Sequence, residues 1–307
     1  MKSFLSLSAL MAVASATVGL LVPMYEYPYG DDALADWNAL ITAVDAHPAM
    51  PFYIIININS GAPYFPNPPS GLDDFAVWID ALNSRSNAKS IGYIHTESSS
   101  RDSSVIIEGV TQYLNWTTSA GRTTNASAYN VQLDGIFFDE IDTDPTKLAY
   151  NTKITEFAKS AFEDRGGPIV LNPGTLVQAG SESLFDIADS IVQMETCYTN
   201  SSGATDPDLY ERCAPDTYTP FTPDALSTLG NETVKAKSSV IVHDFYESWE
   251  PYAQAALASL QEGITAAVSH SVHSFYFSLL GYTGNFTLAP ASIINVATYA
   301  AHAQNLR

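Results

Sequence analysis

Two adjacent carboxylates end an apolar run near the middle of the sequence. The segment at 133–140 reads LDGIFFDE, so Asp139 and Glu140 directly follow three large apolar residues. Charged side chains are rarely buried without a partner, and two of them at the end of a buried strand indicate a functional site. A third acid, Glu195, ends the run SIVQMET at 190–196. Two carboxylates that flank a glycosidic bond can hydrolyse it, because one protonates the leaving oxygen while the other attacks or activates water.

Acids in this position can also have a structural role. They can cap the next helix or pair with loop bases, and Asp142 and Asp144, the latter before Pro145, are predicted to be helix N-caps. For Asp139 and Glu140 we favour catalysis, because the chain has 33 acids and only 13 bases to neutralise them. If two acids lie close together, their repulsion raises one pKa and so creates a proton donor.

The elements that would position these acids follow a regular order. Eight runs rich in β-branched and aromatic residues alternate with amphipathic segments; the runs span 20–28, 52–59, 90–96, 133–140, 168–174, 190–196, 238–245 and 273–280. Strands that are apolar on both faces belong to covered sheets, and strand–helix alternation predicts a parallel sheet. We therefore expect an α/β fold, a single (β/α)8 barrel over residues 20–307, with a doubly wound open sheet as the alternative.

The active sites of such barrels lie at the C-terminal ends of the strands, where this sequence has polar side chains. The predicted substrate-binding residues at these ends are Tyr25, His95, Asn172, Tyr198, His243 and Tyr276. Amides and carboxylates bind sugar hydroxyls, and aromatic rings stack on sugar faces, so the set predicts a carbohydrate site. The alternative for the two histidines is a hydrogen-bonded place in the core, and for Asn172 the fixing of a loop.

The N-terminus has the pattern of a secretory signal peptide. Residues 1–19 contain one lysine, an apolar segment too short to span a membrane, and small residues at a possible cleavage site. Five Asn-x-Ser/Thr sequons agree with an extracellular location; the predicted glycosylation sites are Asn115, Asn125, Asn200, Asn231 and Asn285. We therefore expect a secreted protein that can remain associated with a cell wall.

The chain has two cysteines, Cys197 and Cys213. In an oxidising compartment they are predicted to form a disulfide, which would stabilise the fold by roughly 3 kcal/mol in the chain-entropy model. Two free buried thiols are the alternative. The bridge would hold an inserted loop region at about 197–237, which is rich in Pro, Thr and Asp.

Composition and motifs exclude several other functions. A formal charge of −20 argues against nucleic acid and anionic membranes, since both need a basic surface. No nucleophile-elbow, zinc-protease, phosphate-loop or dinucleotide motif occurs, and the six histidines are scattered, so we expect neither a metal nor another cofactor. No segment after residue 19 predicts a membrane anchor. We expect the protein to be a monomer whose partner is a polysaccharide substrate.

Several segments together resemble one known family. They are VPMYEYP, IIININSGAP, IGYIHTESSSRD, QYLNW, LDGIFFDE, IVLNPGT, ADSIVQMET and VIVH. In this order they resemble the spherulin-4-like secreted proteins of fungi and slime moulds, grouped as glycoside hydrolase family 135. The sequence differs from the family pattern at SGAPYFPNPP after the second run and in the segment between the cysteines.

The resemblance implies a (β/α)8 barrel and an endo-acting α-1,4-N-acetylgalactosaminidase. The implied substrate is galactosaminogalactan, a fungal cell-wall and biofilm polysaccharide that partial deacetylation makes cationic. The family's acidic residues fall on Asp139, Glu140 and Glu195, and a retaining outcome is implied. We expect Asp139 to be the nucleophile or charge stabiliser, Glu195 the acid/base and Glu140 a residue that orients a partner.

Two other functions agree with the same residues. A non-catalytic wall protein could bind a glycan at the barrel mouth, and a related glycosidase could act on another hexosamine or galactose polymer. An enzyme releases new reducing ends from the glycan, whereas a non-catalytic wall protein does not. Activity on a panel of polysaccharides would identify a glycosidase with another substrate.

Overall fold

The computed structural model of the protein describes residues 17–58, 72–119, 129–198, 213, 219–248, 253–254, 257–279 and 286–306. The expected signal peptide lies outside the described residues, apart from 17–19. Among the predicted glycosylation sites, Asn125, Asn200 and Asn285 also lie outside them. Within the described ranges, no helix combines the length and apolarity needed to cross a membrane.

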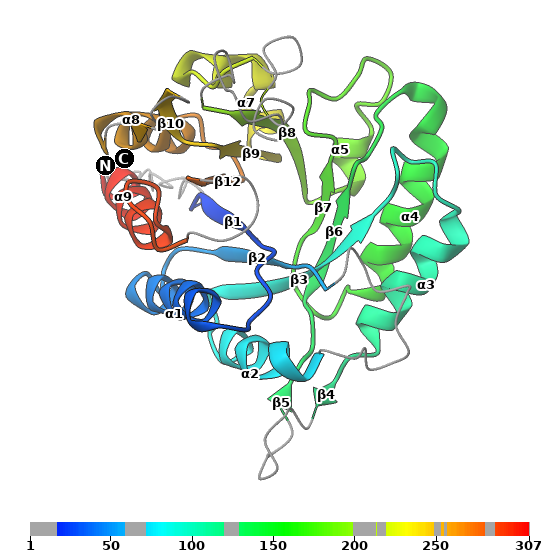
Figure 1. Cartoon of the computed structure of the whole chain (residues 1–307). Helices are drawn as coiled ribbons and strands as arrows, with labels where there is room; N and C mark the ends of the chain where they lie inside the picture. Colours follow the sequence, from blue (N-terminus) through cyan, green and yellow to red (C-terminus); the bar gives the residue numbers. More distant parts are fainter. Residues whose placement is uncertain are drawn as a thin grey trace, which may run out of the picture.

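A closed barrel of eight parallel strands forms the centre of the molecule (Figure 1). In chain order the strands are β1 (Gly19–Met24), β2 (Phe52–Ile56), β3 (Ala88–His95), β6 (Gly135–Asp139), β7 (Ile169–Asn172), β8 (Ser190–Cys197), β9 (Ser238–His243) and β12 (Ser274–Phe277). Each strand pairs with the next in this series, and β12 pairs with β1. The predicted barrel is therefore confirmed, and the open-sheet alternative is wrong.

Helices surround the barrel on its outer side (Figure 1). They are α1 (Asp31–Ala46), α2 (Leu72–Asn83), α3 (Ser103–Leu114), α4 (Leu148–Ala161), α5 (Leu184–Ile187), α7 (Glu232–Lys235), α8 (Leu257–Ser269) and α9 (Ile293–Asn305), with short 3-10 helices η2 (Pro145–Lys147) and η3 (Pro223–Leu229). Phe75, Ile79 and Leu82 recur at helical spacing in α2 and are buried, as an amphipathic helix requires. The Asp144 side chain accepts a hydrogen bond from the Thr146 amide, which confirms its prediction as an N-cap.

Among the described residues, two short antiparallel pairs lie outside the barrel. They are β4 (Thr118–Ser119) with β5 (Tyr129–Asn130), and β10 (Tyr246–Ser248) with β11 (Ala253–Gln254). Neither pair contributes a strand to the barrel wall.

Two separate apolar clusters show which side chains face inward. The inner cluster fills the barrel with Leu21, Ile55, Ile91, Tyr93, Phe137, Val170, Val192 and Ile241. The outer cluster joins the strands to the helices and includes residues such as Leu20, Phe138 and Leu171. Neighbouring residues of one strand thus pack into different clusters, because successive strand side chains point to opposite faces. Which terminal residue of a strand points into the barrel mouth therefore depends on whether it is an odd or an even number of positions from an inward-facing residue.

The predicted inserted region at 197–237 is partly helical. Its described residues include the short helices η3 and α7, so the inserted region is not loop throughout. The Asn231 side chain accepts a hydrogen bond from the Val234 amide and thereby caps α7. The predicted disulfide is confirmed, with Cα atoms of Cys197 and Cys213 5.9 Å apart.

Candidate active site

Three polar side chains lie in one row across the C-terminal ends of adjacent strands. His95 of β3 is in register with Asp139 of β6, which is in register with Asn172 of β7. Residues in register on parallel strands point to the same face. Phe137 and Val170 lie two residues earlier and belong to the inner cluster, so Asp139 and Asn172 also face the interior of the barrel.

Glu195 reaches the same place through an irregularity in β8. Val192 belongs to the inner cluster, whereas Met194 packs against the outer one. The register with β9 shifts between Val192 and Met194, so that one extra residue, Gln193, lies between them. Such a bulge reverses the faces of the residues that follow, and Glu195 therefore points inward. The buried Gln193 side chain is held by the Leu229 carbonyl at 3.0 Å and the Ser238 hydroxyl at 2.7 Å.

One amide group joins the two inward-facing acids. Asn172 Nδ2 lies 2.7 Å from Asp139 Oδ1 and 2.7 Å from Glu195 Oε2. The two carboxylate oxygens are therefore separated by no more than twice 2.7 Å. Asn172 Oδ1 accepts the Gly174 amide hydrogen at 3.0 Å, which fixes the orientation of the NH2 group toward the acids. Carboxyl groups about 5 to 5.5 Å apart are typical of retaining glycosidases, whereas inverting glycosidases have carboxyl groups that lie farther apart.

Tyr93 provides a second hydrogen bond to Asp139. Its hydroxyl donates to Asp139 Oδ2 from within the inner cluster, where its ring stacks on Phe137. Burial raises the pKa of the Tyr93 phenol, and Asp139 raises it further, so the hydroxyl keeps its proton and remains a donor. Sequence reasoning missed Tyr93; its position two residues before His95 on the same strand was the available signal.

Asp139 has an unusual electrostatic environment for a carboxylate. Burial raises the pKa of the Asp139 carboxyl, and the nearby Glu195 carboxylate raises it further. Hydrogen bonds from Tyr93 and Asn172 act in the opposite direction without cancelling the effect. The pair therefore has the like-charge repulsion that catalytic carboxylates use to change proton affinity.

Tyr25 also lies beside the acid pair. Its ring packs edge-on against Tyr93, with centroids 5.5 Å apart. Burial raises the pKa of the Tyr25 phenol, followed by the charges of Asp139 and Glu195, so both acids lie within its electrostatic range. A half-buried tyrosine at this place can contact a sugar bound to the two carboxylates.

Glu140 occupies a different position from its neighbour Asp139. It is exposed, and its Oε2 lies 2.9 Å from His95 Nε2. Its φ of 54° is in the left-handed region, which is costly for a residue other than glycine and is often found at functional sites. The Thr96 hydroxyl lies 2.8 Å from the carbonyl oxygens of Asp139 and Glu140 and helps to hold this turn. His95 and Glu140 thus form a second polar pair beside the acid pair.

The structure does not place two of the predicted substrate contacts at the surface. His243 and Tyr276 are completely buried. His243 Nδ1 lies 2.7 Å from Asp244 Oδ2, and Tyr276 packs against Phe286, so neither is free to bind a sugar in this conformation. His243 lies against the disulfide at Cys197, and Phe286 packs on Tyr276; strand position alone shows neither contact. Tyr198 is half-buried and packs on Phe245, with ring centroids 4.1 Å apart.

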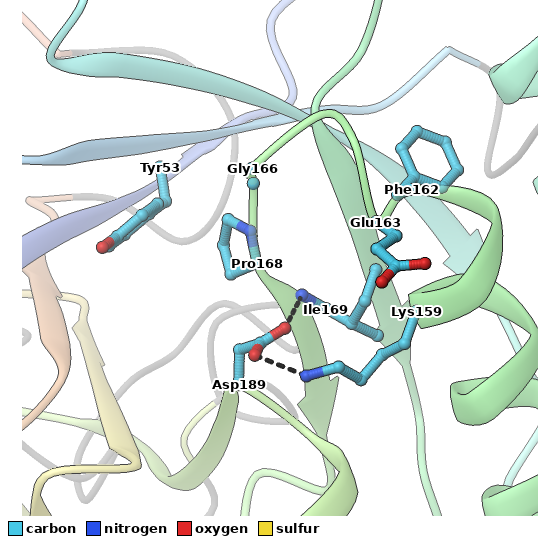
Figure 2. A pocket seen from close by; sticks show the side chains of 9 residues that line it. Tyr53, Lys159, Phe162, Glu163, Gly166, Pro168, Ile169 and Asp189 are labelled. Carbon is cyan, nitrogen blue, oxygen red and sulfur yellow. Dashed lines mark hydrogen bonds and ion pairs between the residues drawn. The ribbon is translucent and has the colours of Figure 1, made fainter.

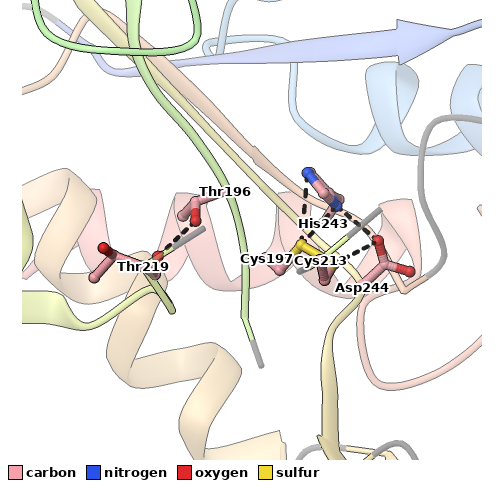
Figure 3. Close-up of a disulfide and its surroundings, with 6 residues drawn as sticks. All are labelled: Thr196, Cys197, Cys213, Thr219, His243 and Asp244. Carbon is pink, nitrogen blue, oxygen red and sulfur yellow. Dashed lines mark hydrogen bonds and ion pairs between the residues drawn. A yellow bond between two sulfur atoms is a disulfide. The ribbon is translucent and has the colours of Figure 1, made fainter. Parts of the chain in front are cut away.

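A buried polar cluster adjoins the end of β8 (Figure 3). It consists of the Cys197–Cys213 disulfide with His243 and Asp244, and one potential ligand atom from each lies within 4.8 Å of all the others. Among the described residues these four could hold a metal ion.

A separate cavity of about 390 Å³ lies at the opposite end of the barrel, where strands begin (Figure 2). It is lined by Tyr53, Lys159, Phe162, Glu163, Gly166, Gly167, Pro168, Ile169 and Asp189. Asp189 accepts hydrogen bonds from Lys159 Nζ at 2.7 Å and from the Ile169 amide at 2.9 Å. In barrels of this type the N-terminal face contributes to stability rather than catalysis, and none of the predicted site residues lines this cavity.

The fold and the acid pair define a (β/α)8-barrel protein with a carboxylate site at the C-terminal ends of its strands. The chain belongs to the Spherulation-specific family 4, whose model matches residues 19–291. The predicted family membership is therefore confirmed. No curated protein sequence matches the chain significantly.

Solved structures agree with the barrel fold. Sph3 of Aspergillus clavatus, solved in complex with GalNAc, is 22% identical with a TM-score of 0.65, over 92% of this chain and 98% of its own. The chitinase of Chromobacterium violaceum is 11% identical with a TM-score of 0.51, over 94% of this chain and 99% of its own. Similarity at these identities shows the fold.

Proposed function

We propose that the protein is a glycoside hydrolase that uses Asp139 and Glu195 as its catalytic pair. The observation that carries the proposal is the shared contact of both carboxylates with Asn172 Nδ2, which keeps their nearest oxygens within twice 2.7 Å. This spacing fits the retaining geometry. Tyr93 and Asn172 fix the direction of Asp139, and their hydrogen bonds lower its pKa against the rise caused by burial and Glu195, which favours the ionised carboxylate that a nucleophile requires.

The reaction takes place in two steps. Asp139 attacks the anomeric carbon and forms a glycosyl ester, while the proton of Glu195 passes to the departing glycosidic oxygen. Glu195 then removes a proton from a water molecule, whose oxygen attacks the same carbon and releases Asp139 as a carboxylate. Glu140 and His95, paired at 2.9 Å, orient a sugar hydroxyl or the acetamido group beside this centre.

The substrate that we propose is a polymer of α-1,4-linked N-acetylgalactosamine, of the galactosaminogalactan type. The family membership supports this choice, as does the GalNAc bound to the similarly folded Sph3. Tyr25 offers an aromatic surface next to the acids. The charge of −20 favours a polymer that carries free amino groups.

Mass spectrometry of products released from galactosaminogalactan tests the proposal. Wild type should release oligosaccharides, whereas Asp139→Asn and Glu195→Gln should each lose at least about 10³-fold in rate, as expected for essential acid–base groups. Asp144→Asn is the matched control, because asparagine also caps a helix and this variant should keep full activity. Saturable binding without new reducing ends would instead identify a non-catalytic wall protein.

We also propose that the protein is secreted after cleavage of a signal peptide within residues 1–19 and is glycosylated. Asn115 and Asn231 are exposed and accessible to modification. N-terminal sequencing of the secreted protein should begin at or near Leu20. Treatment with an N-glycosidase should lower the apparent mass, and an unchanged mass would contradict glycosylation.

A further inference from the structure

Three tyrosines alternate along the short loop that joins β1 to α1. Tyr25 is half-buried beside the acid pair, whereas Tyr27 is 44% exposed and Tyr29 is 74% exposed. Pro28 lies between the two exposed rings and is buried, and the Tyr29 amide donates to the Tyr27 carbonyl at 2.7 Å. This tight turn holds Tyr27 and Tyr29 on the solvent side of the loop.

Two helices hold the loop in place. Trp37 Nε1 donates to the Glu26 carbonyl at 3.1 Å. The Tyr27 hydroxyl donates to the Asp74 carboxylate, and its ring packs edge-on against Phe75 with centroids 5.4 Å apart. These contacts come from α1 and α2, which lie side by side outside the barrel (Figure 1). The loop is therefore ordered before a ligand arrives, and binding loses little conformational entropy.

The loop begins at the acid pair and leads away from it. Tyr25 packs against Tyr93, whose hydroxyl donates to Asp139. The loop after β1 and the start of α2 both lie at the C-terminal face of the barrel, as the acid pair does. From Tyr25 the chain passes outward through Tyr27, which contacts α2, to Tyr29 just before α1. The three rings thus form a path from the acids toward the rim of the barrel.

Exposed aromatic rings next to carboxylates match the chemistry of an amino sugar. A sugar ring packs on an aromatic face, and a protonated amino group is attracted to such a face and to carboxylates. Asp31 and Asp32 closely follow Tyr29 and are exposed, and Asp74 is bonded to Tyr27. The two acids of α1 also stabilise its first turn. Packing does not explain the ring of Tyr29, because a side chain that is 74% exposed gains little from burial.

We propose that Tyr27 and Tyr29 form a binding site for hexosamine units of the substrate polymer, outside the centre that cleaves it. This inference rests on the proposed function, because the occupant is the same glycan chain whose linkage is cut between Asp139 and Glu195. Units beyond the cleaved linkage stack on the two rings. A long chain occupies the acid pair and the rings together, so the site favours polymers over short oligosaccharides.

Affinity electrophoresis with galactosaminogalactan tests the inference on a protein that does not cut the polymer. In the Asp139→Asn background, Tyr29→Ala and Tyr27→Ala should each weaken binding of the polymer about fivefold, as expected for the loss of one stacking ring. Tyr29→Phe keeps the ring and should bind the polymer as tightly as the background. Affinity for GalNAc alone, measured by calorimetry, should stay the same in these variants, because one sugar occupies only the acid centre.

Leu306→Ala is the matched control for an exposed side chain. Leu306 is also 74% exposed, but it follows α9, whose end lies at the opposite face of the barrel, where Gln304 bonds to Val18. This variant should change neither affinity. If wild type neither binds nor cuts the polymer, the proposed function and this inference both fail. If wild type cuts it, the inference alone is overturned by unchanged polymer binding in Tyr29→Ala, or by equal losses for the polymer and for GalNAc.

Discussion

Asn172 controls the distance between the two acids with a single amide group. Its NH2 group contacts both Asp139 and Glu195, and its oxygen is occupied by the Gly174 amide. Without this donor on β7, the carboxylates on β6 and β8, the strands to either side, would repel each other and separate. Sequence position predicted Asn172 as a sugar ligand or a loop residue; the structure places it between the acids, where it positions them.

The Tyr93 hydroxyl provides a test of the role of Asp139. Tyr93→Phe removes a donor that stabilises the ionised carboxylate, so the pKa of Asp139 should rise. A hydrogen bond to a charged group contributes about 1.5 to 3 kcal/mol, or roughly one to two pKa units. If Asp139 is the nucleophile, the acid limb of the pH profile of kcat/KM should move upward by this amount.

Tyr113→Phe is the control for this shift. The Tyr113 hydroxyl donates to the Tyr93 carbonyl at 3.0 Å and does not touch either acid, so its loss should lower stability without moving the profile. A shift of the alkaline limb in Tyr93→Phe would show that Asp139 donates the proton instead. An unchanged pH profile of kcat/KM would show that the titration of Asp139 sets neither limb of the profile.

Asp139→Asn should raise the stability of the protein at neutral pH while it abolishes turnover. The pKa of Asp139 is raised in the folded state, so the ionised carboxylate destabilises that state above this pKa. As the pH falls through the raised pKa, the folded state takes up a proton before the unfolded state, and wild type regains stability. Asparagine carries no charge and can still bond to Tyr93, whose hydroxyl also accepts.

Melting curves from pH 7 to pH 4 measure this effect. The melting temperature of Asp139→Asn should exceed that of wild type at pH 7, and the difference should shrink as the pH falls. Glu140→Gln, at an exposed site, should show a small change throughout. A lower melting temperature for Asp139→Asn at pH 7 would mean that the carboxylate has mainly a structural role.

At the scale of elements, the bulge in β8 decides whether Met194 or Glu195 faces the site. Regular alternation from Val192 would turn Met194 inward and Glu195 outward. The extra residue Gln193 reverses this, and its anchors at Leu229 and Ser238 come from η3 and the start of β9. No local pattern in SIVQMET predicts the bulge. The sequence placed Glu195 at a strand end, but only the packing of distant segments directs it inward.

The turn after β7 supports Glu195 through a glycine. Gly174 has a φ of 66°, its carbonyl accepts the Glu195 amide hydrogen at 2.9 Å, and an added Cβ would lie 3.6 Å from Glu195 Oε2. Gly174→Ala should lower stability by about 1 kcal/mol and activity by about tenfold. Relief of the backbone strain would move the Gly174 carbonyl away from the Glu195 amide and the Gly174 amide away from Asn172 Oδ1. Thermal denaturation and initial rates measure the two effects.

Gly166→Ala is the matched control. Its φ is 70°, and an added Cβ would meet nothing within 4 Å, so it should lose similar stability and keep its activity. Equal loss of activity in both variants would show that the effect of Gly174→Ala is general destabilisation rather than displacement of Glu195.

At the scale of the molecule, much of the architecture could be predicted from the sequence. The run at 133–140 contains β6, as predicted. A short, nearly continuous apolar segment that ends in acids is typical of a buried strand. Such a segment does not reveal its inner and outer faces, however, and so Tyr93 was missed. His243 and Tyr276 are buried, beside the disulfide and against Phe286 respectively, and strand position does not show these contacts.

The charge of the whole molecule leads to the last prediction. With −20 at pH 7, the protein attracts a polymer with free amino groups from a distance, and added salt screens that attraction with a Debye length of about 10 Å at 0.1 M. For partly deacetylated galactosaminogalactan, kcat/KM should fall several-fold between about 50 and 500 mM salt. The same polymer after complete chemical N-acetylation should show little dependence, because it is neutral. Rates of release of reducing ends measure both, and an equal salt dependence for the two polymers would mean that surface charge plays no part in substrate capture.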